Sequence, residues 1–169
     1  EFRRVLFRSG REELLHRPVI VGLGPAGLFC GYYLAKYGYR PIIIERGEDV
    51  DRRQKTVEHF WETGELDTES NVQFGEGGAG TFSDGKLNTS VKDPSGRNRL
   101  VLETFVRFGA DESILYDNKP HIGTDVLSEV IVNMREFLVD KGAAFVFDTC
   151  VNNLDIVSQK LLSVYTDSD

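Results

Sequence analysis

The sequence predicts an α/β fold with a central parallel sheet, on three observations. A strand–helix–strand unit fills residues 18–45, a helix and a strand fill residues 124–147, and a short antiparallel pair follows at 151–166. Strands joined by a crossover helix run parallel, so the first three strands belong in one sheet with helices against it. The expected architecture is half of a doubly wound domain, ending in a small antiparallel β-meander.

The first unit contains a glycine motif, GLGPAG, directly after the apolar residues 19–21. Gly22 suits a tight turn, Gly24 allows close approach to a pyrophosphate, and Gly27 allows the helix to pack on the strand. Pro25 suits the first helical position, and the positive end of the helix favours an anion. The motif therefore predicts a dinucleotide site.

An acidic residue ends the second strand of this unit. Glu45 lies 18 residues beyond Gly27, close to the ~20-residue spacing of an acid that binds a ribose 2′-hydroxyl. A glycine-rich turn without a ligand is the alternative interpretation. The order of strand, glycines, helix, strand and acid favours the dinucleotide.

The other elements follow from periodicity and turn residues. The helix of the first unit should span 25–37, between strands at 18–22 and 41–45. A weaker helical pattern covers Val50 to Trp61. The remaining expected elements are a helix at 100–108 closed by Gly109, a helix from 124 to 141 capped by Thr124 or Asp125, a strand at 144–147, and strands at 151–156 and 160–166.

A second glycine-rich segment, NVQFGEGGAGTFSDGKLN, occupies residues 71–88. Its glycines at 75, 77, 78 and 80 leave backbone N–H groups uncovered, and such groups form anion-binding nests or lie flat on a ring system. Thr81, Ser83 and Lys86 would add donors. A flexible surface loop is the alternative, because glycine-dense loops are common.

The two glycine segments, with the later KPHIGTDVL, resemble the bacterial FAD-dependent dehydrogenases, or NAD(P)/FAD-dependent oxidoreductases, which are flavoproteins with two dinucleotide-binding domains. The resemblance implies a Rossmann-like FAD/NAD(P)-binding domain and hydride transfer at the flavin, with NAD(P)H as a candidate electron donor. It also implies a backbone contact from Val151 to adenine. The cofactor-binding residues it implies are Gly22, Gly24, Pro25, Ala26, Gly27, Glu45, Arg46, Gly77, Gly78, Ala79, Gly80, Thr81 and Val151.

Two alternatives stay open: an NAD-binding dehydrogenase, and a non-catalytic dinucleotide-binding module. No residue is assigned as a catalytic acid or base. His121 is a candidate because histidine is the side chain most often used as a general acid or base, but a lone loop histidine before a helix is more typical of a structural role. The small-molecule substrate is unknown.

The composition of the chain argues against some classes of binding partner. The chain has 169 residues, 40% of them hydrophobic, and a formal charge of −7, which argues against nucleic acid or an anionic membrane surface. The longest apolar run is far short of the ~20 residues that span a bilayer. Cys30 and Cys150 form no disulfide framework and no metal-ligand spacing, so we expect two small buried residues and no metal. A cytoplasmic location is the default expectation.

Both ends suggest a piece of a longer protein. Residues 1–9, EFRRVLFRS, resemble the translation of a sequencing-adapter oligonucleotide, so native sequence is expected from about Gly10. Residues 10–17 form a lead-in. Residues 18–169 form a partial FAD-binding domain with an inserted segment at about 46–123. The final strand would leave an open sheet edge, so parts of the chain on both sides are expected to be missing here.

Overall fold

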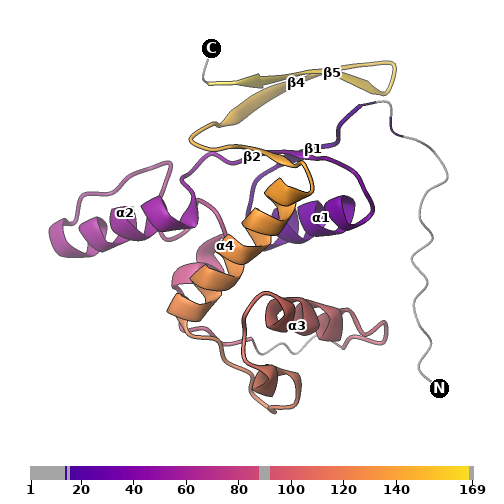
Figure 1. Ribbon diagram of the computed structural model, residues 1–169. Helices are drawn as coiled ribbons and strands as arrows, with labels where there is room; N and C mark the ends of the chain where they lie inside the picture. The colour runs from indigo at the N-terminus through magenta and orange to yellow at the C-terminus, as the bar shows by residue number, and fades with distance from the viewer. Residues whose placement is uncertain (1–13, 15, 88–91, 168–169) are drawn as a thin grey trace.

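The structure, a computed structural model, describes residues 14, 16–87 and 92–167 of the chain. The segment attributed to an adapter, and Asn88 at the end of the second glycine-rich segment, lie outside the described residues. Figure 1 shows a sheet flanked by helices, with a separate two-stranded hairpin near the C-terminus.

Three parallel strands form the central sheet, as predicted. β1 (Val19–Val21) and β3 (Ala144–Val146) pair with opposite edges of β2 (Ile42–Ile44). The β-branched residues of β2 suit a strand buried on both faces, and Ile43 has no exposed surface. This order places the end of β1 next to the end of β2, where a ligand binds in open α/β sheets.

Two helices pack together beside the sheet, and Figure 1 shows the hairpin on its other side. α1 (Pro25–Lys36) and α4 (Thr124–Asp140) contact each other, and α1 contacts β1. Gly31 allows α1 to pack closely against β2 and α4. A Cβ at this position would lie 3.1 Å from the Ile43 Cδ1 atom and 3.6 Å from the Leu138 side chain. The apolar core lies at this junction.

The start of α4 differs from the expected cap. Gly123, with extended backbone angles, is the N-cap, and no side chain caps the helix. The residue before it, Ile122, donates its amide to the Gly85 carbonyl, so the chain is still extended there and Thr124 is already helical. The prediction of Thr124 or Asp125 as the cap was wrong. The predicted end was correct, since Lys141 is the C-cap and Gly142 has a φ of +84°.

Two further helices connect β2 to α4. α2 (Val50–Thr63) begins at Asp49, whose carboxylate accepts the Arg52 amide, and ends at Gly64. α3 (Arg97–Arg107) ends before Gly109, as predicted. Short 3₁₀ turns, η1 (Ala79–Phe82) and η2 (Glu112–Leu115), lie between the helices.

The C-terminal hairpin was also predicted. β4 (Val151–Val157) pairs antiparallel with β5 (Lys160–Thr166). Ser158 and Gln159 both have positive φ angles, as a two-residue type I′ turn requires. No helix within the described ranges is long and apolar enough to cross a membrane.

The expectation of two buried cysteines was wrong for Cys30, which is exposed. Its neighbours Leu28, Gly31, Tyr32 and Ala35 form the buried face of α1, and the 3.6-residue period places residue 30 on the opposite face. Cys150 is half-buried.

Candidate cofactor-binding site

The first glycine turn has the geometry that its sequence predicts. Gly22 has a φ of +91° and donates its amide to the Ile44 carbonyl at 2.7 Å. A Cβ on Gly27 would lie 1.9 Å from the Gly22 carbonyl oxygen. Pro25 is the first residue of α1 and Gly24 its N-cap. The turn therefore brings the helix start directly against the end of β1.

Gly24 differs from Gly27 in what surrounds it. A Cβ on Gly24 would meet only the Gly78 Cα atom, at 4.0 Å, and one on Gly22 would meet nothing within 4 Å. The Gly24 backbone is extended, with φ of −67°, so its conformation does not require glycine. The absence of a side chain at Gly24 leaves open space where a pyrophosphate would approach.

A cavity of about 300 Å³ lies at the carboxyl ends of β1 and β2. Four segments of the chain surround it: the first glycine turn, the end of β2, the second glycine-rich segment and the start of β4. Six predicted cofactor-binding residues line it: Gly22, Gly24, Glu45, Arg46, Gly78 and Val151. Gly75, one of the glycines expected to leave its amide uncovered, also lines it. The sequence analysis did not assign the other lining residues to the site, namely Val21, Ile44, Gln73, Phe74, Thr149 and Cys150.

A second cavity, of about 220 Å³, adjoins the same turn. Pro25, Gly77 and Gly80 line it, together with mainly apolar residues of α1, α3 and α4. Consecutive residues therefore divide between the two spaces: Gly24 and Gly78 face the first cavity, and Pro25 and Gly77 face the second. The other predicted site residues, Ala26, Gly27, Ala79 and Thr81, line neither cavity.

Glu45 lies in the first cavity, but its carboxylate also supports the turn. One oxygen accepts the Leu23 amide at 2.5 Å and the other accepts the Gly47 amide at 3.0 Å. The residue is buried. A carboxylate offers about four acceptor positions, so acceptor capacity for a ribose hydroxyl is left. Glu45 thus joins the ends of β1 and β2 at the cavity.

Arg46, next to it, is held at the cavity from two sides. Its guanidinium donates to Glu69 at 2.6 and 2.9 Å and lies 4.4 Å from the centre of the Phe74 ring. The pKa of Arg46 is raised, chiefly by the hydrogen bond to Glu69. The cavity wall therefore carries a guanidinium that is fixed in place and paired with the Glu69 carboxylate.

The second glycine-rich segment packs against the first turn. The Gly77 amide donates to the Leu23 carbonyl at 2.9 Å, and a Cβ on Gly78 would lie 2.9 Å from the Pro25 Cδ atom. The Gly78 amide donates to Gly75 and the Thr81 amide to Gly78. The expectation of uncovered amides was therefore wrong for Gly77 and Gly78, because the segment uses these two amides to fold and to attach to the turn.

Thr81 is also not a donor to either cavity. It is fully buried, and its hydroxyl has no partner among the described residues. A Cβ on Gly77 would lie 2.3 Å from the Thr81 hydroxyl oxygen. This threonine therefore packs beneath the segment, and the glycine at position 77 makes room for it.

Two buried charged residues that the sequence analysis did not assign to the site hold this segment from below. Arg53, on α2, has no exposed surface and donates to the carbonyls of Asn71, Glu76 and Gly78 at 2.7 to 3.0 Å. Burial lowers its pKa to about 10, so the guanidinium stays charged at neutral pH. Helical spacing could have identified Arg53 as a buried residue, because position 53 falls on the same face of α2 as the buried Val50 and Val57.

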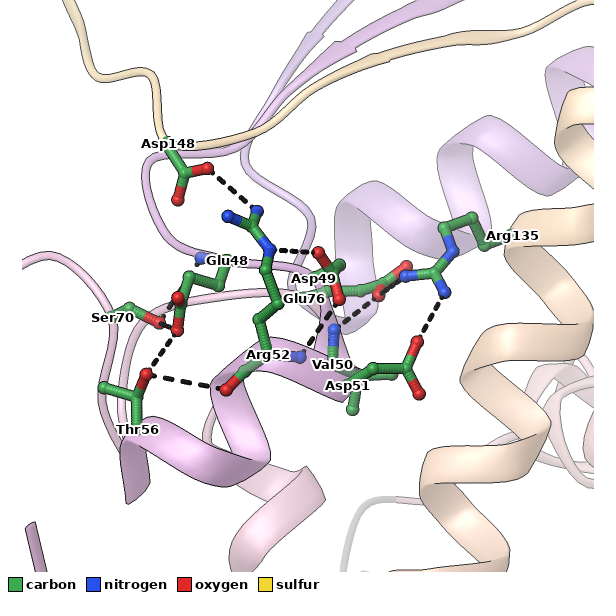
Figure 2. Close-up of polar contacts among 10 residues, drawn as sticks. All are labelled: Glu48, Asp49, Val50, Asp51, Arg52, Thr56, Ser70, Glu76, Arg135 and Asp148. Carbon is green, nitrogen blue, oxygen red and sulfur yellow. Dashed lines mark hydrogen bonds and ion pairs between the residues drawn. The ribbon is translucent and has the colours of Figure 1, made fainter. Parts of the chain in front are cut away.

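Glu76 is the second of these residues. One carboxylate oxygen accepts the Val50 amide at 2.8 Å and Arg135 Nη1 at 2.5 Å, and Arg135 also pairs with Asp51 at 2.9 Å. Figure 2 shows Glu76 between the start of α2 and the Arg135 side chain of α4. Burial raises the pKa of Glu76 to about 7, against the lowering effect of Arg135. Glu76 thus links the glycine segment to both helices.

The stability of the fold is expected to fall as pH rises from about 4.5 to about 7. The folded state keeps a proton on Glu76 in this range that the unfolded chain releases, because the folded pKa is the higher one. The loss should be about 3 kcal/mol in the free energy of unfolding. Urea unfolding at about pH 5 and about pH 8 measures it. Glu76→Gln, which does not titrate, should flatten this slope, and an unchanged slope would contradict the assignment to Glu76.

His121 lines neither cavity. Its backbone forms an isolated antiparallel β-bridge with Lys86. This bridge connects the end of the second glycine-rich segment to the loop that precedes α4. Within the described ranges, no group of three or more His, Cys, Asp or Glu side chains is arranged to hold a metal ion.

The parallel sheet, its helices and the glycine turn define a Rossmann-like fold. Residues 20–72 match the family model described as an NAD(P)-binding Rossmann-like domain. This match confirms the predicted fold class and the resemblance of the glycine motif to those of dinucleotide-binding proteins.

The chain is also similar to an uncharacterised protein of Clostridium beijerinckii, with 50% identity over 157 residues. The aligned part is 93% of this chain and 29% of that relative, so the chain spans under a third of the relative's length. Among solved structures, THI4 of Thermovibrio ammonificans has a TM-score of 0.49 at 20% identity, covering 89% of this chain and 47% of that one. L-amino acid deaminase from Proteus vulgaris has a TM-score of 0.41 at 15% identity, covering 95% and 47%.

Proposed function

We propose that the chain binds FAD and belongs to a flavin-dependent oxidoreductase. The observation that carries the proposal is the pair of cavities on either side of one glycine turn. An extended dinucleotide would cross the turn at Gly24, with one nucleoside in each cavity. The first cavity contains an acid and a cation, and the second is mainly apolar.

The residues of the first cavity suit the adenosine and pyrophosphate. Beside this cavity, the start of α1 leaves the amides of Ala26 and Gly27 without intrahelical acceptors, although neither residue lines the cavity itself. The positive helix end favours phosphate. The open space above Gly24 fits the same group. Glu45 would accept a ribose hydroxyl, and the backbone at Val151 would contact adenine.

The second cavity would take the flavin ring. Phe29, Leu87 and Phe105 line it with apolar surface, and Ser83 and Lys86 are its polar lining residues. Bound FAD would supply hydride transfer, and donors near the ring would stabilise the negative charge of its reduced form. The protein's part is to orient the ring, exclude water from it and hold NAD(P)H or another small-molecule donor beside it. We expect a cytoplasmic protein that binds neither nucleic acid nor a membrane.

The flavin spectrum of the purified full-length protein tests this proposal. We expect bound flavin with visible absorbance, bleached by a reductant such as NADPH. A colourless protein that binds NADH would overturn the choice of FAD and support the second candidate, an NAD-binding dehydrogenase, which the description of the matching family model favours. Tightly bound flavin that no reductant reduces would point instead to a non-catalytic dinucleotide-binding module.

A further inference from the structure

We propose that Arg53 is a positioning residue for the cofactor: its buried guanidinium holds the second glycine-rich segment in the one conformation that completes both cavities. The inference rests on the proposed function, because the cavities it shapes are those assigned to FAD. Arg53 touches neither cavity. It acts through the peptide groups that it binds.

The contacts of Arg53 set the direction of two peptide groups. In a trans peptide the carbonyl and the following N–H point in opposite directions. Arg53 Nη1 binds the Glu76 carbonyl at 2.7 Å, so the next amide, that of Gly77, points away from Arg53 and donates to Leu23 in the first turn. Nη1 also binds the Gly78 carbonyl at 3.0 Å, which turns the Ala79 amide away in the same manner.

The glycine at position 75 is an independent sign of this arrangement. A Cβ there would lie 2.4 Å from Arg53 Cδ and 2.9 Å from Arg53 Nε. The segment therefore wraps tightly around the arginine stem, and the Phe82 ring lies 4.8 Å from the guanidinium carbon. Arg53 Nε completes the arrangement by binding the Asn71 carbonyl at 2.8 Å.

An apolar side chain would be the less costly residue at position 53. The neighbouring positions on the buried face of α2, Val50 and Val57, are apolar. Taking a guanidinium out of water has a large desolvation cost, and Arg53 Nη2 has no partner among the described residues. In return, the guanidinium binds three backbone carbonyls and fixes their positions. Without these bonds, the glycines of the segment would permit many conformations.

Affinity for FAD and protease sensitivity test the inference in the full-length protein. Arg53→Met should weaken FAD binding by about 10- to 100-fold, the scale typical of removing a residue that orients the binding groups of a site. Arg53→Lys, which keeps the charge but not the planar fork, should restore part of that loss. Lys55→Met removes an exposed cation from the same helix and should bind FAD as the wild type does. In apo protein, chymotrypsin should cleave at Phe74 and Phe82 fastest in Arg53→Met and more slowly in Arg53→Lys.

The outcomes separate this inference from the proposed function. Wild-type protein without FAD affinity overturns both. Wild-type affinity in a folded Arg53→Met variant overturns the role of Arg53 and leaves the flavin proposal standing. If Arg53→Met does not fold, Arg53→Lys decides: reduced affinity with local cleavage at the glycine segment and a retained melting temperature supports positioning, and unchanged affinity overturns it.

Discussion

Gly27→Ala is expected to lower the free energy of unfolding by about 3 kcal/mol or more. The new methyl group would lie 1.9 Å from the Gly22 carbonyl oxygen and 3.0 Å from its carbon. Both are backbone atoms of the turn that directly follows β1, so no side chain can rotate away. Overpacking of this kind costs about 1–3 kcal/mol when side chains adjust, and here the helix must move from the strand. Urea unfolding at constant pH measures the change.

Gly31→Ala on the same helix is the matched control. Its methyl group would meet only side-chain atoms, Ile43 Cδ1 at 3.1 Å and the Leu138 methyl groups at 3.6 Å. These can shift, and alanine gains about 1 kcal/mol over glycine in a helix. We therefore expect a change within about 1 kcal/mol. Equal losses at both positions would show that the contact between Gly27 and Gly22 does not limit the packing of α1.

Gly24→Val is expected to leave the fold intact and to weaken FAD binding by about 10- to 100-fold, because overpacking costs about 1–3 kcal/mol and each 1.4 kcal/mol is tenfold in affinity. The Gly24 backbone is extended, which valine adopts readily. A Cβ there projects toward Gly78 across otherwise open space, where the pyrophosphate would lie. Unfolding measurements and FAD titration of the same preparation separate the two effects.

Gly24→Ala should give an intermediate affinity, because one methyl group fills less of the space. Gly31→Ala, remote from both cavities, should bind FAD like the wild type. Unchanged affinity in a folded Gly24→Val variant would place the pyrophosphate elsewhere and contradict the proposed course of the ligand.

Local signals were sufficient for most of the fold. The strand–helix–strand unit, the helix before β3 and the hairpin each carry a periodic pattern with turn residues at its ends. The C-terminal hairpin is an example. Apolar and polar residues alternate along both strands, which leaves only Ser158 and Gln159 to reverse the chain. Glu45 was predicted at the cavity for the same reason, because its distance from the glycine motif is fixed by one helix and one strand.

The second glycine-rich segment could not be predicted in this way. Its composition indicates only conformational freedom, and the conformation it adopts depends on Arg53, the Leu23 carbonyl and the first turn. These partners are separated from it in sequence, and no periodicity connects them. The free amides expected from composition at Gly77 and Gly78 were wrong for this reason: within a folded protein, buried N–H groups find acceptors.

The hydrogen bond from Gly77 to Leu23 has a consequence for how the site arises during folding. The first turn and its helix are local structure, but the cavities need a contact of high sequence separation, whose loop-closure entropy slows its formation. The isolated unit of residues 18–45 therefore contains the recognisable motif without the walls that enclose a ligand. Transplanting the motif alone into another scaffold should transfer a helix and a turn, and the affinity should follow only when residues 71–83 are transferred with them.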